Sequence, residues 1–219
     1  DNTNFNGGWL NVASVSGGGT VYVPHGRFPT TALAPITASH VWLRGAGPGS
    51  QLQFAPTADD QILIDSTGHD FGIFDLTLMS LDTTLRKVAV RHTTGDEPKF
   101  ENVWIGGIGG NNWTDAGNGS TGFYILGHNF VKLNRVNVAA NRPLRFGGAT
   151  GTDFVALTHS YLFALNNGAG PNNAHPVIEV DGDSLIGFFQ VNDVSLAGGS
   201  AAVQWVATVD RGNIGSWEF

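Results

Sequence analysis

The sequence predicts an all-β fold in the form of a parallel β-helix, and three observations support this expectation. Glycine accounts for 31 of the 219 residues. Charged residues make up only 13% of the chain. Short strands of alternating apolar and polar residues recur in groups of three. This composition is typical of a β protein with many turns, and the recurrence favours a coil that repeats.

The first two strands are expected within "GGGTVYVPHGRFPTT", residues 17–31. Thr20–Val23 is rich in strand formers, and Pro24 ends this strand. Gly26 then suits a turn before Phe28 resumes an extended path. A single strand does not require so many turn residues, so the stretch is better explained as the start of a repeat.

Four apolar positions with offsets 0, 2, 5 and 7 then recur at spacings of roughly 23 to 35 residues, as two short strands meeting at a bend require. Complete copies are Ile36, Ala38, Val41 and Leu43; Phe71, Ile73, Leu76 and Leu78; Val131, Leu133, Val136 and Val138; and Phe189, Val191, Val194 and Leu196. Before each copy comes another short strand, which we call the first strand of the coil. Three strands make a triangular coil, and stacked coils place like strands about 4.8 Å apart around one core. A β-sandwich or irregular barrel, the alternative, needs more hairpin turns.

The stacking makes specific expectations about the core and the surface of the first strands. Their inward residues are expected to form one column, namely Ile64, Val90, Ile125, Phe146 and Val180. Their outward residues are expected to form two more columns, namely Leu63, Ala89, Tyr124, Arg145 and Glu179, and Asp65, Arg91, Leu126, Gly147 and Asp181.

The N-terminal quarter resembles a known family. "DNTNFNGGWLNVASVSGGGTVYVPHGRFPTT" and "ITASHVWLRGAGPGSQLQF" are similar to the N-terminal signature of the pectate-lyase-like superfamily, found in phage tailspikes and secreted polysaccharide-active enzymes. The resemblance covers residues 1 to 54 and implies a right-handed helix, here of about seven coils. It also implies a capping helix over residues 1–16, with Asp1 and Thr3 at its N-cap and Trp9 on its buried face. The abrupt ends indicate that residues 1–219 are one β-helix domain of a longer protein.

Composition argues against several other functions. The net charge is −7 and the 11 Lys and Arg residues are scattered, so we expect no nucleic-acid partner. There is no cysteine, and no apolar run approaches the ~18 residues of a membrane span. The histidines show no metal-binding spacing, and "RGAGPGS" lacks the Lys-Ser/Thr of a phosphate loop. No metal and no cofactor are therefore expected.

The catalytic candidates are Arg145, Glu179 and Asp181. Stacking of the first strands places Arg145 one coil from Glu179, and period-two alternation puts both carboxylates on one face about 7 Å apart. This separation suits the acid and base of an inverting glycosidase. Two alternatives remain open, a solvated strand end with a salt bridge to Arg145, and a calcium site that adds Asp183.

Substrate-binding candidates come from all three strands of the coil. Tyr124 shares the outward column of Arg145, while Glu101 and His159 are expected in one outward column of the second strand with Phe74, Asn134 and Asn192. Trp104 points outward on the third strand, before the loop that carries Trp113, and a second loop carries Asn172. Exposed rings stack on pyranose faces, and amides meet hydroxyls. The alternatives are an ordinary polar ladder and loops that pack against another protomer.

Function is inferred mainly from the resemblance. It implies a phage tailspike or tail-fibre type protein, in the virion tail or outside the cell, that recognises a bacterial surface polysaccharide and either depolymerises it or only binds it. The alternatives are a secreted polysaccharide lyase or glycoside hydrolase, and a structural spike without catalytic activity. We also expect a homotrimer in contact with other tail proteins, from the resemblance and from four apolar residues expected on the surface, Leu63, Phe74, Leu126 and Leu162.

Overall fold

The protein is described from a computed structural model that covers residues 9, 17–106, 112–166, 174–181, 186–201, 203–206 and 214–218. These residues form one sheet of 15 strands, and every strand pair within it is parallel. The strands are β1 (Gly19–Val23), β2 (Gly26–Thr30), β3 (Val41–Gly45), β4 (Ser50–Phe54), β5 (Gln61–Ser66), β6 (Gly72–Ser80), β7 (Lys87–His92), β8 (Lys99–Ile105), β9 (Thr121–Asn134), β10 (Asn137–Ala140), β11 (Arg142–Ala164), β12 (Ile178–Asp181), β13 (Ile186–Gly198), β14 (Val203–Val206) and β15 (Ile214–Glu218). The all-β, parallel class is thus confirmed.

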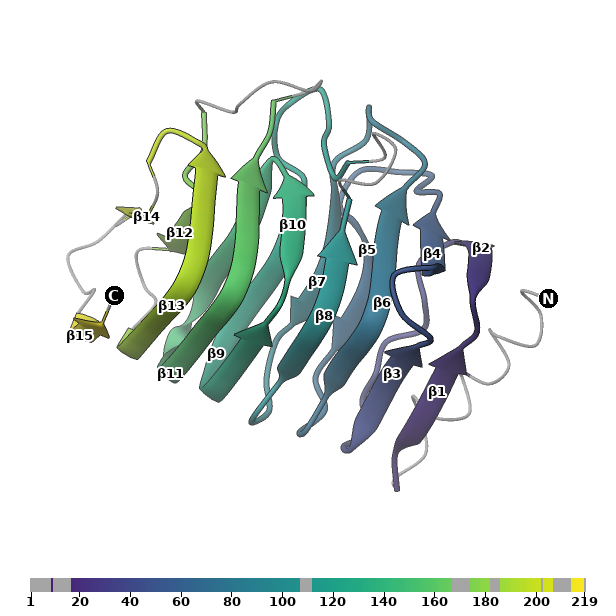
Figure 1. Cartoon of the computed structure of the whole chain (residues 1–219), viewed down its shortest axis with the longest axis horizontal. Helices are drawn as coiled ribbons and strands as arrows, with labels where there is room; N and C mark the ends of the chain where they lie inside the picture. Colours follow the sequence, from purple (N-terminus) through teal and green to yellow (C-terminus); the bar gives the residue numbers. More distant parts are fainter. Residues whose placement is uncertain are drawn as a thin grey trace.

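The strand pairs build three stacks around a common core, as expected of a β-helix type fold (Figure 1). Stack 1 contains β5, β7, the first parts of β9 and β11, β12 and β14. Stack 2 contains β1, β3, the first parts of β6 and β8, the last part of β9, the middle of β11, the first part of β13 and β15. Stack 3 contains β2, β4, the last parts of β6 and β8, β10, and the last parts of β11 and β13. In Figure 1, stacks 2 and 3 face the reader and β5, β7 and β12 lie behind them.

The apolar repeat fills this core. All four positions of the copy at 71–78 and of the copy at 131–138 are at most 1% exposed. The predicted copy at residues 36–43 does not form two adjoining strands of one coil. Ile36 forms a bridge with Ser66 beside stack 1, whereas Val41 and Leu43 belong to β3 in stack 2. Between these residues the chain passes from stack 1 to stack 2.

The turn from stack 2 to stack 3 has the same form in successive coils. A single residue with a left-handed backbone separates the two stacks, at Asp75 (φ 53°), Asn102 (53°), Arg135 (53°), His159 (49°) and Asp193 (52°). Asparagine, aspartate and histidine adopt this conformation more readily than β-branched residues do. Asn102 Nδ2 also donates a hydrogen bond of 2.8 Å to Asp75 Oδ1 one coil away. The turn therefore has a constant length from β6 onward and keeps the two stacks in phase there, whereas two residues separate β1 from β2 and four separate β3 from β4.

The predicted register of stack 1 is wrong by two residues between β7 and β9. Val90 pairs with Phe123, and Ile125 pairs with His92, so the expected inward column is split into two. The cause is a bend in each strand of the stack, where two consecutive residues are buried, as in Leu63–Ile64. Leu63 and Ala89, expected on the surface, are fully buried for this reason, and Leu162 in stack 3 is buried as well.

The predicted capping helix, residues 1–16, lies outside the described residues except for Trp9. The Trp9 side chain is 1% exposed, and its Nε1 donates a hydrogen bond of 2.7 Å to the carbonyl oxygen of Ala34. This contact joins the N-terminal segment to the first coil. In the described part of the chain, no helix has the length and apolar character needed to cross a membrane.

Candidate functional site

A row of polar side chains runs across the outer face of stack 1. Strand pairing places Asp65, Arg91, Tyr124, Arg145 and Glu179 on consecutive strands in one register. The adjacency of Tyr124, Arg145 and Glu179 is as predicted. Asp65 and Arg91 occupy the places expected for Leu63 and Ala89, because the bend turns those two apolar residues into the core.

Arg145 is the centre of the row. Its Nε and Nη2 lie 3.0 Å from Oδ1 and Oδ2 of Asp181, respectively, which makes a bidentate ion pair. The guanidinium carbon also lies 4.5 Å from the centre of the Tyr124 ring, a cation–π contact. Tyr124 Oη donates a hydrogen bond of 3.4 Å to Asp181 Oδ2. A Cβ at Gly147 would lie 2.7 Å from that same carboxylate oxygen, so glycine leaves the space for this cluster.

Glu179 is the buried carboxylate of the site, with 6% of the residue exposed. Its Oε2 lies 3.6 Å from Arg142 Nε and 3.9 Å from His175 Nδ1, and its Oε1 lies 3.7 Å from Arg145 Nε. Burial raises the pKa of Glu179 above its usual value, and the charges of Arg142 and Arg145 only partly oppose this shift. The pKa of His175 is lowered by burial and by Arg142. The imidazole is therefore mainly neutral at pH 7.

These residues surround a cavity of about 360 Å³ on stack 1, which we call the arginine groove. Its lining includes Arg86, Arg91, Arg142, Arg145, Tyr124 and His175. Glu179 and Asp181 are not among the lining residues, but they form ion pairs with Arg142 and Arg145, which are.

The arginines of the groove keep part of their hydrogen-bonding capacity. Arg86, Arg91 and Arg145 use Nε and Nη2 in ion pairs with Asp60, Asp65 and Asp181, which leaves each Nη1 without a protein partner among the described residues. Arg142 Nε is buried, and among the described residues it has no hydrogen-bond partner, since Glu179 lies 3.6 Å away. The groove can therefore bind an anionic or strongly polar group.

Arg142 and His175 are site residues that the sequence reading missed. Strict alternation would place Arg142 on the opposite face from Arg145. Pro143 and Leu144 are both buried, however, so the residues on either side of them point outward together. The paired apolar residues in the equivalent strands, Leu63–Ile64 and Ala89–Val90, are the signal that could have shown this bend.

Glu101 and His159 lie on stack 2, apart from the arginine groove. Glu101 pairs with Asn134, which pairs with Thr158, whereas His159 is the left-handed turn residue that follows. The predicted column is thus wrong by one residue at His159. Asn134 still joins the two side chains, since its Nδ2 donates to Glu101 Oε1 at 3.3 Å and its Oδ1 lies 3.3 Å from His159 Nδ1. Both are exposed on a polar ladder.

The expectation of an exposed Trp113 is wrong. Its backbone forms a parallel bridge with Ala140, which adds it to the edge of stack 3 and turns the ring into the core. The ring is fully buried, stacks on Phe54 at 5.7 Å and donates from Nε1 to the carbonyl oxygen of Leu78 at 3.0 Å. Asn172 and Asp183 lie outside the described residues.

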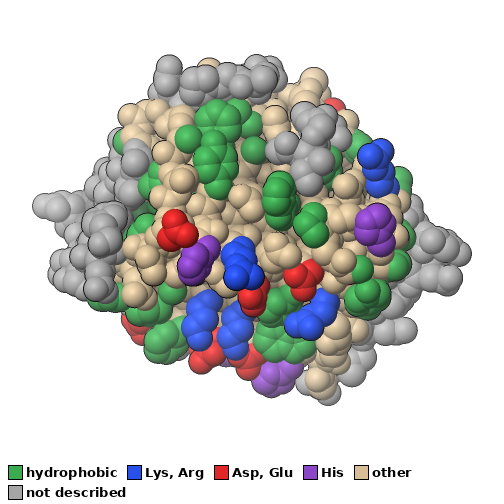
Figure 2. Space-filling model, in the orientation of Figure 1, with side chains coloured by type: hydrophobic (Ala, Val, Ile, Leu, Met, Phe, Trp, Pro, Cys, Tyr) green, Lys and Arg blue, Asp and Glu red, His purple; other side chains and the backbone are tan. Residues whose placement is uncertain are grey.

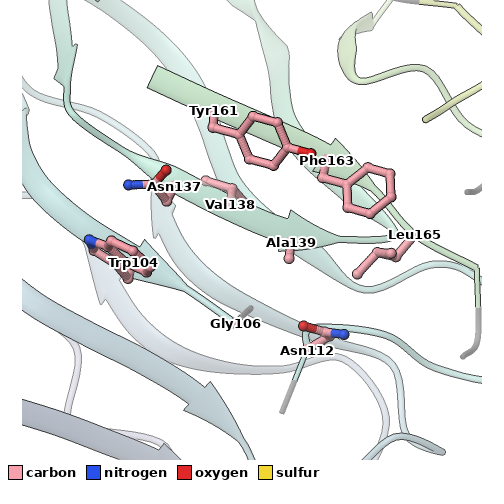
Figure 3. Close-up of a pocket in the computed structure, with 9 residues that line it drawn as sticks. All are labelled: Trp104, Gly106, Asn112, Asn137, Val138, Ala139, Tyr161, Phe163 and Leu165. Carbon is pink, nitrogen blue, oxygen red and sulfur yellow. The ribbon is translucent and has the colours of Figure 1, made fainter. Parts of the chain in front are cut away.

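Trp104 lines a second cavity, of about 300 Å³, on the outer face of stack 3. Tyr161, Phe163, Asn112 and Asn137 are among its other lining residues (Figure 3). Within the described residues, no group of three or more His, Asp or Glu side chains is placed to hold a metal ion.

Comparison with known proteins gave no match, since no family model, no curated protein and no solved structure is similar to this chain.

Proposed function

We propose that this chain is the polysaccharide-recognising β-helix of a phage tailspike or tail-fibre type protein, and that the arginine groove binds and cleaves a bacterial surface polysaccharide. The observation that carries the proposal is the arginine groove, whose lining arginines and tyrosine contact two carboxylates in different environments, the buried Glu179 and the partly exposed Asp181. The location in a virion tail and the partnership with other tail proteins follow from the resemblance alone.

The proposed architecture is a right-handed helix of about seven coils with a capping helix that begins before Trp9. A homotrimer is part of the same proposal. Leu63 and Leu162 give it no support because they are buried. Phe74 and Leu126 are partly exposed and still support it. Further support is a row of outward rings on stack 2, in which Phe130, Phe154 and Phe188 follow one another at 6.0 and 5.2 Å, with Phe130 45% exposed.

In the proposed reaction, Glu179 is the general acid and Asp181 the general base. Burial favours the protonated form of Glu179, which can give its proton to the glycosidic oxygen as the bond to the anomeric carbon breaks. Asp181, oriented by Arg145 and Tyr124, takes a proton from the water whose oxygen forms the new bond to that carbon. A secreted glycoside hydrolase would use the same steps.

Binding without cleavage is the second candidate, and one observation favours it. Both carboxylates are engaged by arginines and neither lines the cavity. In this case the ion pairs only fix the arginines, whose remaining donors hold the sugar, as in a non-catalytic spike.

Replacing Glu179 by Gln or Asp181 by Asn is expected to abolish depolymerisation, because neither amide can transfer the proton. Release of reducing ends from capsule and lipopolysaccharide measures turnover, and a melting curve verifies folding. Asp193→Asn, which changes an exposed carboxylate at the turn after stack 2, is the matched control and keeps full activity.

The same assay separates the two candidates. Wild-type turnover that persists in both variants would place the chemistry elsewhere. A wild type that binds a glycan through Arg145 without releasing reducing ends would leave the binding spike. If Arg145→Ala kept both glycan binding and turnover, this result would contradict both candidate functions.

A further inference from the structure

The cavity on stack 3 has the features of a separate sugar site, and we propose that it binds a neutral pyranose chain. We call it the aromatic groove. This proposal goes beyond the proposed function because it assigns a second site with a different ligand specificity. It rests on the proposed function only in taking a glycan as the ligand.

The aromatic groove is built from outward positions of three successive strands. Asn137 on β10 pairs with Trp104 on β8 and with Tyr161 on β11, and Ala139 pairs with Phe163. The backbone positions of Trp104 and Tyr161 are thus two strands apart, about 9.6 Å along the stack, a spacing that suits two units of a sugar chain with one unit between them. Figure 3 shows the rings around Ala139, whose small side chain leaves the floor open.

The chemistry of the lining favours a neutral sugar. No residue that lines the cavity is charged, in contrast to the arginine groove. In Figure 2 most charged side chains on this face lie in its lower part, whereas hydrophobic side chains occur in both parts. Pyranose faces carry apolar C–H groups that stack on rings, and the amides of Asn112 and Asn137 can reach the hydroxyls at the edges.

The rings are available to a ligand in the described part of the chain. Tyr161 is 42% exposed, and its ring centre lies 6.2 Å from that of Phe163, tilted by 47°. An apolar contact with another protein does not require amides between the rings. Because Asn112 and Asn137 lie among the rings of this groove, we prefer a sugar to a protein as its ligand.

The segment 112–120 lies between the two grooves. Asn112 lines the aromatic groove, while Gly117 and Gly119 line the arginine groove. The segment is held rigidly, because the buried Asp115 carboxylate accepts backbone hydrogen bonds from Gly117, Gly119 and Ser120. This segment therefore borders both grooves, one on stack 3 and the other on stack 1.

Binding of neutral and acidic oligosaccharides, measured by calorimetry, tests the proposal. The probes are maltohexaose and cellohexaose as neutral chains and hexagalacturonate as an acidic chain. Trp104→Ala and Tyr161→Ala are each expected to weaken binding of a neutral probe about tenfold, and Trp104→Phe to restore most of it, since the ring supplies the contact. Tyr22→Ala removes an exposed ring outside the groove and is the control, and Arg145→Ala is expected to leave neutral binding unchanged.

Three results would overturn the proposal. The first is that neither neutral probe binds the wild type. The second is that the Trp104 and Tyr161 variants bind a neutral probe as tightly as the wild type does. The third is that Trp104→Ala changes the oligomeric state in light scattering, which would make the groove a protein interface. The proposed function fails separately, through unchanged glycan binding and turnover in Arg145→Ala, so the two failures are distinguishable.

Discussion

Replacing Ile125 by Asp is expected to unfold the protein. Ile125 is 1% exposed and pairs with His92 and Phe146 on the neighbouring strands of stack 1. A carboxylate here is buried beside His92 and Phe146, and its burial costs several kcal/mol, comparable to the total stability of about 5–15 kcal/mol of a typical domain. Far-UV circular dichroism and urea denaturation measure the result.

Leu81→Asp is the control for this change. Leu81 is 48% exposed, and the same substitution there is expected to alter stability by about 0.5 kcal/mol or less. A cooperative urea transition of Ile125→Asp at the wild-type midpoint would contradict the burial of Ile125 and with it the stacked core.

The stability of the protein is expected to rise by about 3 kcal/mol between pH 7 and pH 10.5 relative to Lys87→Met. Lys87 is fully buried, and its Nζ donates hydrogen bonds to the carbonyl oxygens of Leu85 (2.9 Å) and Thr114 (2.7 Å). Burial lowers the pKa of Lys87 from 10.5 to about 8. A neutral amine still has two N–H donors for these two carbonyls.

The sign follows from proton binding. Between pH 8 and pH 10.5 the unfolded chain keeps a proton on this lysine that the folded protein has lost, so the free energy of unfolding increases with pH. Below pH 8 the folded state bears the full cost of the buried charge. Urea denaturation at pH 7 and pH 10.5 measures the difference, and Lys132→Met, on the exposed face of stack 2, corrects for loss of a lysine elsewhere. Parallel changes of wild type and Lys87→Met with pH would refute the prediction.

The parallel all-β class was predictable because the pattern that encodes it is local. Inward residues such as Phe71, Ile73, Leu76 and Leu78 repeat regularly enough to show two strands and a bend, and all four are buried. Register was harder, because it depends on how many consecutive residues turn inward at each bend. Alternation counts Leu63 as outward, whereas the bend buries both Leu63 and Ile64.

The candidate site was predictable only where the local register was regular. Tyr124, Arg145 and Glu179 fall on three successive strands without an irregularity between them, and the structure brings them together. Trp113 was misplaced because its burial arises from a single bridge to Ala140, a long-range contact without a sequence pattern. His159 was misplaced by one residue because a left-handed turn residue takes a position that alternation assigns to the strand.

From β6 onward the turn between stacks 2 and 3 is a single residue, so changes in coil length there fall in the other two passages. The passage from stack 3 to stack 1 varies most, since it takes only Asn141 between β10 and β11 but residues 106–120 between β8 and β9. That passage forms the rim of both grooves. Segments exchanged there would alter ligand preference while every strand keeps its partners, so the scaffold is suited to diversification by loop grafting, in evolution as in the laboratory.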